Sequence, residues 1–335
     1  MDIRRADVIS LYDLEFKGDV LSSKDRKILQ EKSQQTHMGK RFSSSFSWLF
    51  YGEQLPGSER FSLPVTSKEK SQRGACVLVD ADNAIGVYSV WNSLRDQADP
   101  LALKRNAWEL SSSQVEDFNR LGLDLEEVER HYPFVAIQAE ASDLPQFCAN
   151  NAEDLGRLFT GDYESEDPSC LKEYISGNLS RRSYERLLIR WTEALAVYAG
   201  DISEDQYENS LFRAVQVFEA CIMVRALFRK ISKRADSMKR KLIVFTPHPW
   251  AVKGIMNSMA AAEETFIVSP PVSSVEAERL LLTSYERFGI GKTVESARRV
   301  CESLDNRFQW VKAQILGGVA VAVFVIDTLL KWKGK

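Results

Sequence analysis

Hydrophobic positions near the C-terminal end of the chain follow two patterns on one predicted helix. Apolar residues recur at three- and four-residue spacing from Val294 onward, the heptad repeat of a coiled-coil seam. A nearly continuous apolar run then extends from Val311 to Leu330, flanked by Trp310 and Trp332. At 1.5 Å per residue the two tryptophans lie about 33 Å apart, close to the hydrocarbon thickness of a bilayer. The pattern predicts a coiled-coil stalk at residues 292–309 that continues into a single transmembrane helix at residues 310–332.

Polar residues inside this run leave a packed core helix as the alternative to a membrane span. Lys312, Gln314 and Asp327 interrupt the apolar sequence and shorten its charge-free part. The flanking tryptophans resemble an aromatic belt, and the lysines after the run can extend to lipid phosphates, which favours the span. Asp327 precedes Lys331 by four residues, which predicts an ion pair at headgroup level. The alternative for Asp327 is a larger ring of helices in which its face lines a polar pore.

The seam also predicts a homo-oligomer. The positions expected at the interface between copies are Val294, Ala297, Cys301, Leu304, Phe308, Val311, Gly318 and Ala322. The last two form a small-xxx-small pair, which lets helix backbones approach closely in lipid.

The N-terminal part of the chain carries strand patterns and is predicted to form an α/β domain over residues 1–150. Alternating residues indicate a first strand within residues 1–16 and another at residues 134–139. Two apolar runs, ACVLVD and AIGVYSVW, flank a turn-rich centre and predict a hairpin over Ala75–Trp91. A helical pattern covers residues 113–130.

Residues 151–291 are predicted to form a mainly helical domain with short strands. Ser180 is a candidate N-cap for a helix that ends at Gly200, and Ser203 caps a second helix that reaches about Arg234. Short strands are expected at residues 242–245 and 266–268, and a helix at residues 274–288 that turns at Gly289. The expected fold class is therefore α+β, with a long helix at the C-terminal end.

Composition limits the class of protein. Of the 335 residues, 44% are hydrophobic and 27% are charged, which is typical of a globular protein with a core. The net charge of −3 argues against nucleic acid as a partner. Five scattered cysteines form no CxxC pair, which argues against a zinc ribbon or a disulfide framework. The first residues contain no apolar signal segment, so we expect a tail-anchored protein whose bulk faces the cytoplasm.

Two groups of residues are candidates for binding, and no catalytic residue can be assigned. A basic cluster is a candidate for pairing with the acidic residues 140–173, for binding anionic lipid headgroups or, as the weakest alternative, for binding nucleic acid; it contains Arg229, Lys230, Lys233, Arg234, Lys239, Arg240 and Lys241. Asp80 and Asp82 are a candidate pair for a divalent metal, or else belong to a turn in which their side chains bond their own backbone. Because no third ligand lies nearby, the turn is the simpler interpretation.

The hairpin sequence ACVLVDADNAIGVYSVW and the tail ESLDNRFQWVKAQILGGVAVAVFVIDTLL resemble the β-hairpin and the C-terminal span of the Rmd1/Sif2 family. The resemblance implies an α/β domain, helices and one C-terminal span, distantly similar to CorA-type transporters. The Gly-Met-Asn signature of those transporters and their second span are missing here, so the residues do not support ion conduction. The resemblance carries over no functional residue and no cofactor.

These observations favour an oligomeric membrane protein with a cytoplasmic sensing or scaffolding domain, with a pore-forming or ion-transport role as a further possibility. A membrane-tethered, metal-dependent enzyme acting near Asp80, Asp82 or His248 is the alternative from another class.

Overall fold

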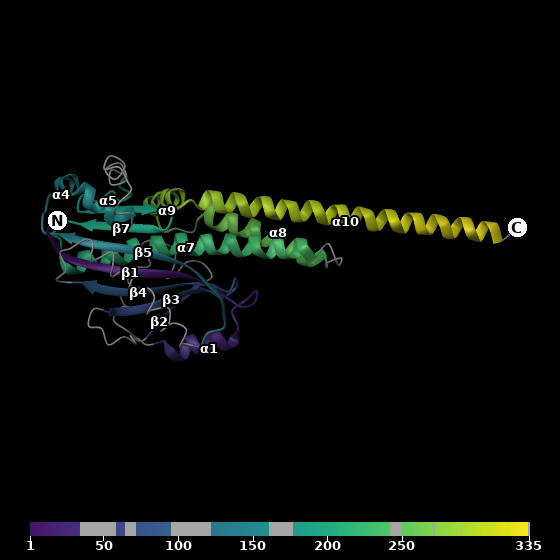
Figure 1. Cartoon of the computed structure of the whole chain (residues 1–335), viewed down its shortest axis with the longest axis horizontal. Coiled ribbons are helices and arrows are strands. Elements are labelled where there is room, and N and C mark those ends of the chain that lie inside the picture. The colour runs from purple at the N-terminus through teal and green to yellow at the C-terminus, as the bar shows by residue number, and fades with distance from the viewer. Residues whose placement is uncertain are drawn as a thin grey trace. The chain divides into compact units, whose positions relative to one another are not determined.

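The computed structural model describes residues 1–33, 58–63, 72–94, 122–160, 177–241, 249–270 and 272–333. These residues have a mixed α+β fold with a long C-terminal helix, which confirms the expected fold class (Figure 1). They divide into two compact units. The first contains Met1–Ala226 and Pro270–Ile290, and the second contains Leu227–Ser269 and Gly291–Lys335.

The first unit is built on a sheet whose described strands follow the order β2-β3-β4-β1-β5-β7-β6. Their bounds are β1 Ile3–Phe16, β2 Ser58–Leu63, β3 Gln72–Asp80, β4 Ile85–Leu94, β5 Leu125–Ala139, β6 Glu185–Arg190 and β7 Glu193–Tyr198. Neighbouring strands are antiparallel except β5 and β7, which are parallel. The N-terminal strand therefore lies inside the sheet, between β4 and β5.

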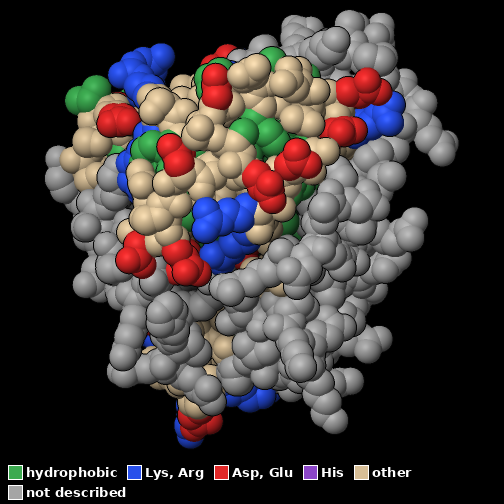
Figure 2. All heavy atoms as spheres, turned by 90° about the vertical axis from the view of Figure 1, so that its left-hand side faces the viewer, with side chains coloured by type: hydrophobic (Ala, Val, Ile, Leu, Met, Phe, Trp, Pro, Cys, Tyr) green, Lys and Arg blue, Asp and Glu red, His purple; other side chains and the backbone are tan. Residues whose placement is uncertain are grey.

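The described helices are of very different lengths. Their bounds are α1 Ser23–Lys32, α4 Leu144–Asn150, α5 Ala152–Thr160, α7 Glu204–Lys241, α8 Pro249–Glu263, the π-helix η1 Glu264–Val268, α9 Val275–Phe288 and α10 Ile290–Lys333. Among the described residues on the side where α4, α5 and the N-terminus lie, charged side chains of both signs are interspersed, and the hydrophobic ones form small, separate patches (Figure 2). That pattern is the ordinary one for a surface in water.

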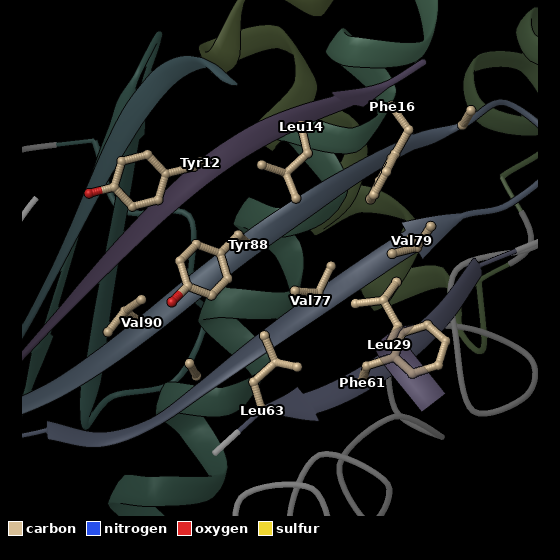
Figure 3. Close-up of a cluster of buried hydrophobic side chains, with 12 residues drawn as sticks. Tyr12, Leu14, Phe16, Leu29, Phe61, Leu63, Val77, Val79, Tyr88 and Val90 are labelled. Atoms are coloured by element: carbon tan, nitrogen blue, oxygen red, sulfur yellow. The ribbon is translucent and has the colours of Figure 1, made fainter. Parts of the chain in front are cut away.

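One face of the sheet forms a hydrophobic core around β1 to β4. Tyr12, Leu14 and Phe16 alternate along β1 and lie among side chains of β2, β3 and β4, such as Val77 of β3 (Figure 3). Leu29 of α1 is 1% exposed and completes this cluster. Residues two apart on a strand share a face, so these three positions of β1 all serve this core.

The opposite face packs against the first half of α7 and against α9. Trp91 of β4 stacks on Phe212 at 4.8 Å between ring centroids, and Phe134 of β5 lies 5.8 Å from Phe218. Phe288, at the end of α9, lies 5.6 Å from the same Phe218 ring. This half of α7 is thus apolar because it is covered by sheet and helix together.

Buried charged pairs also join the sheet to α7. Arg60 of β2 donates to both carboxylate oxygens of Glu219 of α7, and both residues are almost fully buried. Arg5 of β1 contacts Asp7 at 2.9 Å, and the Tyr207 hydroxyl of α7 donates to Asp7 at 2.7 Å. Each of these four buried charges therefore has an opposite charge or a donor beside it, as burial requires.

Several predicted elements are confirmed. The hairpin is present as β3 and β4, with Asp80 paired with Ile85 across the turn. The backbone nitrogen of Gln206 donates to the hydroxyl of Ser203, the predicted N-cap of α7. Ser274 caps α9, which ends at Gly289 in the left-handed conformation with φ +77°.

The helix predicted from Ser180 to Gly200 is wrong, because this segment is the hairpin of β6 and β7. Its apolar run showed no alternation because β7 lies between β5 and β6 and is buried on both faces. The predicted helix at residues 113–130 is likewise wrong over 125–130, which belongs to β5, and the strand at 266–268 is instead part of η1. The strand expected at residues 242–245 lies outside the described residues.

The second unit contains the C-terminal part of α7, then α8, η1 and α10. Its buried side chains include Ile231 of α7, Val252 and Met259 of α8, and Phe266 of η1. Arg298 of α10 contacts Glu263 at the end of α8 at 2.9 Å. Figure 1 shows α8 running back from the end of α7, so α8 is antiparallel to α10.

Candidate functional site: the exposed part of the C-terminal helix

The C-terminal part of α10 presents large apolar side chains that no part of the described chain covers. Trp310 is 61% exposed, Val321 is 64% exposed and Phe324 is 71% exposed. The helix is long and apolar enough to cross a membrane, and the most apolar part of it is not buried at all. In the part of the chain that the structure describes, no other helix has this length and composition.

The exposed apolar side chains lie on every side of α10. Successive residues are about 100° apart on a helix. By this rotation Ile315, Val319 and Ile326 lie on one side of the helix, and Phe324 lies on the opposite side. Val321 and Val325 lie between these two sides. A helix that docks on a single partner helix needs only one apolar stripe. An apolar surface all round instead matches a helix that is surrounded by hydrocarbon.

The first part of α10 is different, because its apolar seam is buried within one chain. Val294, Ala297, Cys301 and Leu304 are at most 6% exposed. Burial raises the pKa of the Cys301 thiol to about 11, with smaller contributions from the charges of Glu263 and Glu302. The spacing that predicted a contact between copies is therefore accounted for, at these four positions, by packing inside one protomer.

The remaining seam positions lie further along the helix. Phe308 and Val311 are half-buried, whereas Gly318 and Ala322 are exposed. At these positions a contact between copies stays a prediction. Asp327 is exposed on α10, and the side chains of Lys331 and Trp332 lie beyond the described side chains. The ion pair predicted for Asp327 and the outer tryptophan of the belt therefore also stay predictions.

A second exposed tryptophan lies level with Trp310. Trp250, in the first turn of α8, is 71% exposed, and the Lys253 ammonium lies 6.0 Å from the centre of its ring. Trp250 precedes Glu263 by thirteen residues, and Trp310 follows Arg298 by twelve. Because Glu263 contacts Arg298 and the helices are antiparallel, both tryptophans lie about 18–20 Å from that ion pair in the same direction. The sequence did not indicate Trp250, because its position beside Trp310 depends on how α8 packs against α10.

The basic cluster belongs to the last part of α7. Lys233, Arg240 and Lys241 are exposed, and Arg240 contacts Asp236 at 2.6 Å. Arg229, Arg234 and Lys239 are half-buried. Lys230 is only 4% exposed, so this predicted lipid ligand is part of the packed interior and is not available to a headgroup.

Asp80 lies in the β3–β4 turn and bonds to that turn. The backbone nitrogen of Asn83 donates to Asp80 Oδ1 at 3.1 Å, and Asn83 Nδ2 donates to Oδ2 at 2.8 Å. Burial raises the pKa of Asp80, while these hydrogen bonds oppose that shift. Among the described residues no three His, Cys, Asp or Glu side chains gather in a way that could hold a metal. Asp82 is exposed beside the turn, and His248 lies outside the described residues.

The structure also contains a pocket of about 110 Å³ in the first unit that the sequence did not indicate. Four arginines line it, and they come from three separate segments: Arg181 and Arg182 precede β6, Arg213 belongs to α7, and Arg279 belongs to α9. The sequence signal was only the pair Arg181-Arg182, which is common on surfaces. The distance in sequence between the other members hid the cluster.

Comparison with known proteins adds no relative: no protein-family model matches the chain, and neither curated proteins nor solved structures give a match. The function of this chain is therefore inferred from the geometry and chemistry of its described residues.

Proposed function

We propose that this protein is a single-span membrane protein, with α10 in the bilayer and the folded part on the cytoplasmic side as a scaffold or sensor. The exposed apolar surface all around the second part of α10 carries the proposal. In water this surface would be larger than a soluble monomer ordinarily exposes without a partner. In a bilayer the same side chains meet hydrocarbon.

The level of the bilayer surface is inferred from the two exposed tryptophans. Trp250 and Trp310 lie level with each other, and tryptophan favours the boundary between headgroups and hydrocarbon. Lys253 beside Trp250, and Lys312 just beyond Trp310, place positive charge at the same level. We therefore place α8's first turn at the membrane surface, where the exposed lysines and arginines at the end of α7 add attraction to anionic lipids.

One observation supports the cytoplasmic side for the folded part, since lysines and arginines flank the apolar run of α10 on both sides and their charge favours neither. The described cysteines Cys76, Cys148, Cys221 and Cys301 are all free thiols, as is usual in a reducing compartment.

Membrane fractionation tests the proposal. The full-length protein should pellet with membranes and resist extraction by alkaline carbonate, and a variant that lacks residues 309–335 should stay in the supernatant. A protein that is soluble at full length without detergent would overturn the proposal. Protease digestion of intact vesicles, with an epitope at the N-terminus, tests the side: the epitope should be lost from vesicles whose cytoplasmic face is outside.

A further inference from the structure

The arginine-lined pocket of the first unit has the features of a binding site rather than of a charged surface. It encloses about 110 Å³, enough for several water-sized groups. Arg181, Arg182, Arg213 and Arg279 line it together with only two carboxylates, Glu185 and Glu276. The pocket therefore has an excess of positive charge.

The segment that presents Arg181 and Arg182 is fixed by its own hydrogen bonds. Asn178 Oδ1 accepts from the backbone nitrogens of Ser180 and Leu187, both at 3.0 Å, so the segment is tied to β6. The Ser180 hydroxyl accepts from the backbone nitrogen of Arg182 at 3.2 Å. A ligand that binds here meets a wall that is already formed, which lowers the entropy lost on binding.

The arginines are positioned by neutral groups as well as by carboxylates. Arg213 donates to the backbone oxygen of Asn209 and to the Ser210 hydroxyl, both at 3.1 Å, and Arg182 donates to the Tyr184 hydroxyl at 3.1 Å. The contact between Arg182 and Glu185 is long, at 3.9 Å. Burial, together with the charge of Arg182, lowers the pKa of Arg213, so two like charges are held close in a partly desolvated place. An anion between them would relieve that repulsion.

The Arg60–Glu219 pair shows how this chain arranges an arginine that has only a structural role. There the carboxylate meets the guanidinium through two hydrogen bonds, and both groups are enclosed. The pocket differs, because it is open to solvent and its arginines outnumber its carboxylates.

We propose that this pocket binds the phosphate group of a small phosphorylated molecule. The planar fork of arginine matches the oxygens of phosphate, and a cluster of arginines is the usual protein surface for recognising it. Thr283, on the α9 wall, is a further polar residue of the pocket. The proposal does not depend on membrane attachment, because every lining residue belongs to the first unit.

Calorimetric titration of the full chain in non-ionic detergent tests the proposal, with inorganic phosphate, pyrophosphate and glycerol phosphate as probes. All three should bind, because each presents phosphate oxygens to the arginines. Arg279→Gln and Arg213→Gln should each weaken binding about tenfold or more, since each removes a charge-assisted contact. Arg279 is exposed, so its variant should fold normally.

The matched control is Arg287→Gln, which removes an exposed arginine of α9 that does not line the pocket. Its affinity should equal that of the wild type. The absence of binding for all three probes, or an equal loss in the control, would overturn the proposal.

The pH dependence of sulfate binding supplies a further test. Sulfate keeps its charge between about pH 6 and pH 8, so a change in its affinity over this range reports a change in the charge of the pocket. Burial raises the pKa of Glu185 to about 7, although Arg182 beside it and Arg213 of α7 oppose the shift. Tyr198 of β7 also senses the charge of Glu185, and Glu276 and Arg279 face the pocket from α9. Ionisation of Glu185 should make sulfate binding several-fold weaker at pH 8 than at pH 6. Glu185→Gln should remove that difference, and a variant that keeps it would contradict the assignment of the site.

Discussion

The two parts of α10 have similar apolar residues and opposite surroundings. From Val294 to Leu304 the apolar side chains form one stripe that is buried within the chain, while Glu302 and Arg299 on other sides are exposed. From Trp310 to Ile326 apolar side chains lie on all sides and are exposed. The distribution around the axis, rather than the amount of apolar residue, therefore distinguishes a helix packed in water from one suited to lipid.

We expect the largest effect from a charge introduced into the buried part of α10. Leu304→Asp places a carboxylate where the side chain is fully enclosed, and we expect a loss of about 3–5 kcal/mol in the free energy of unfolding. The urea midpoint of the detergent-solubilised protein measures it, with Glu302→Gln as the exposed control on the same turn. Unchanged stability together with a smaller assembly in light scattering would show instead that Leu304 faces another copy.

The same substitution in the exposed part should act on insertion and not on folding. Val321→Asp lies near the middle of the apolar run, where a carboxylate costs about 3 kcal/mol in transfer to the bilayer. We expect less membrane-integrated protein and an unchanged urea midpoint, with Val321→Leu as the control. If Val321→Asp lowered the midpoint as Leu304→Asp does, the two parts of α10 would not differ in surroundings.

A smaller effect, on partition into the membrane, should test where the membrane surface lies along α8 and α10. Trp250→Ala removes an exposed ring from the proposed membrane surface, and we expect about 1 kcal/mol weaker partition, because the ring is only partly buried there. Vesicle flotation of a variant that also carries Val321→Asp makes this difference measurable. As a control, Trp191→Ala removes a tryptophan of similar exposure from the β6–β7 turn and should leave the partition unchanged. Equal effects of the two substitutions would contradict the placement of Trp250 at the membrane surface.

The smallest expected effect is at Asp327. If Asp327 pairs with Lys331 at headgroup level, Asp327→Asn should change insertion by less than about 0.5 kcal/mol. Reconstituted wild type and variant should then both show no ion flux. Flux in the wild type that changes in the variant would support the pore instead.

The sequence predicted the elements whose signals are local. Asp80 to Asn83 between two apolar runs is enough to specify the β3–β4 turn, and the caps Ser203, Ser274 and Gly289 act within four residues of their own position. These features depend on few distant contacts, so they can be predicted without the fold.

The missed elements depend on distant partners. β7 is a strand because it pairs with β5, whose Phe134 lies opposite Ala194, and nothing within the segment excluded a helix. The level of Trp250 depends on the Glu263–Arg298 contact, and the pocket depends on α9 meeting the segment before β6. Such contacts join residues that local patterns treat separately, so the site was less predictable than the hairpin or the long C-terminal helix.

The place of β1 inside the sheet has a consequence for biosynthesis. Ile3 pairs with Ala139 and Ala6 pairs with Leu94, so the first strand has no neighbour until much of the chain has been made. At a translation rate of about 5–20 residues per second, β1 waits roughly ten seconds for β5 to be complete. Until β4 has been made, both edges of β1 are unpaired, and one edge stays unpaired until β5 is complete. We expect this protein to need a chaperone on its N-terminal segment while the ribosome is still translating it.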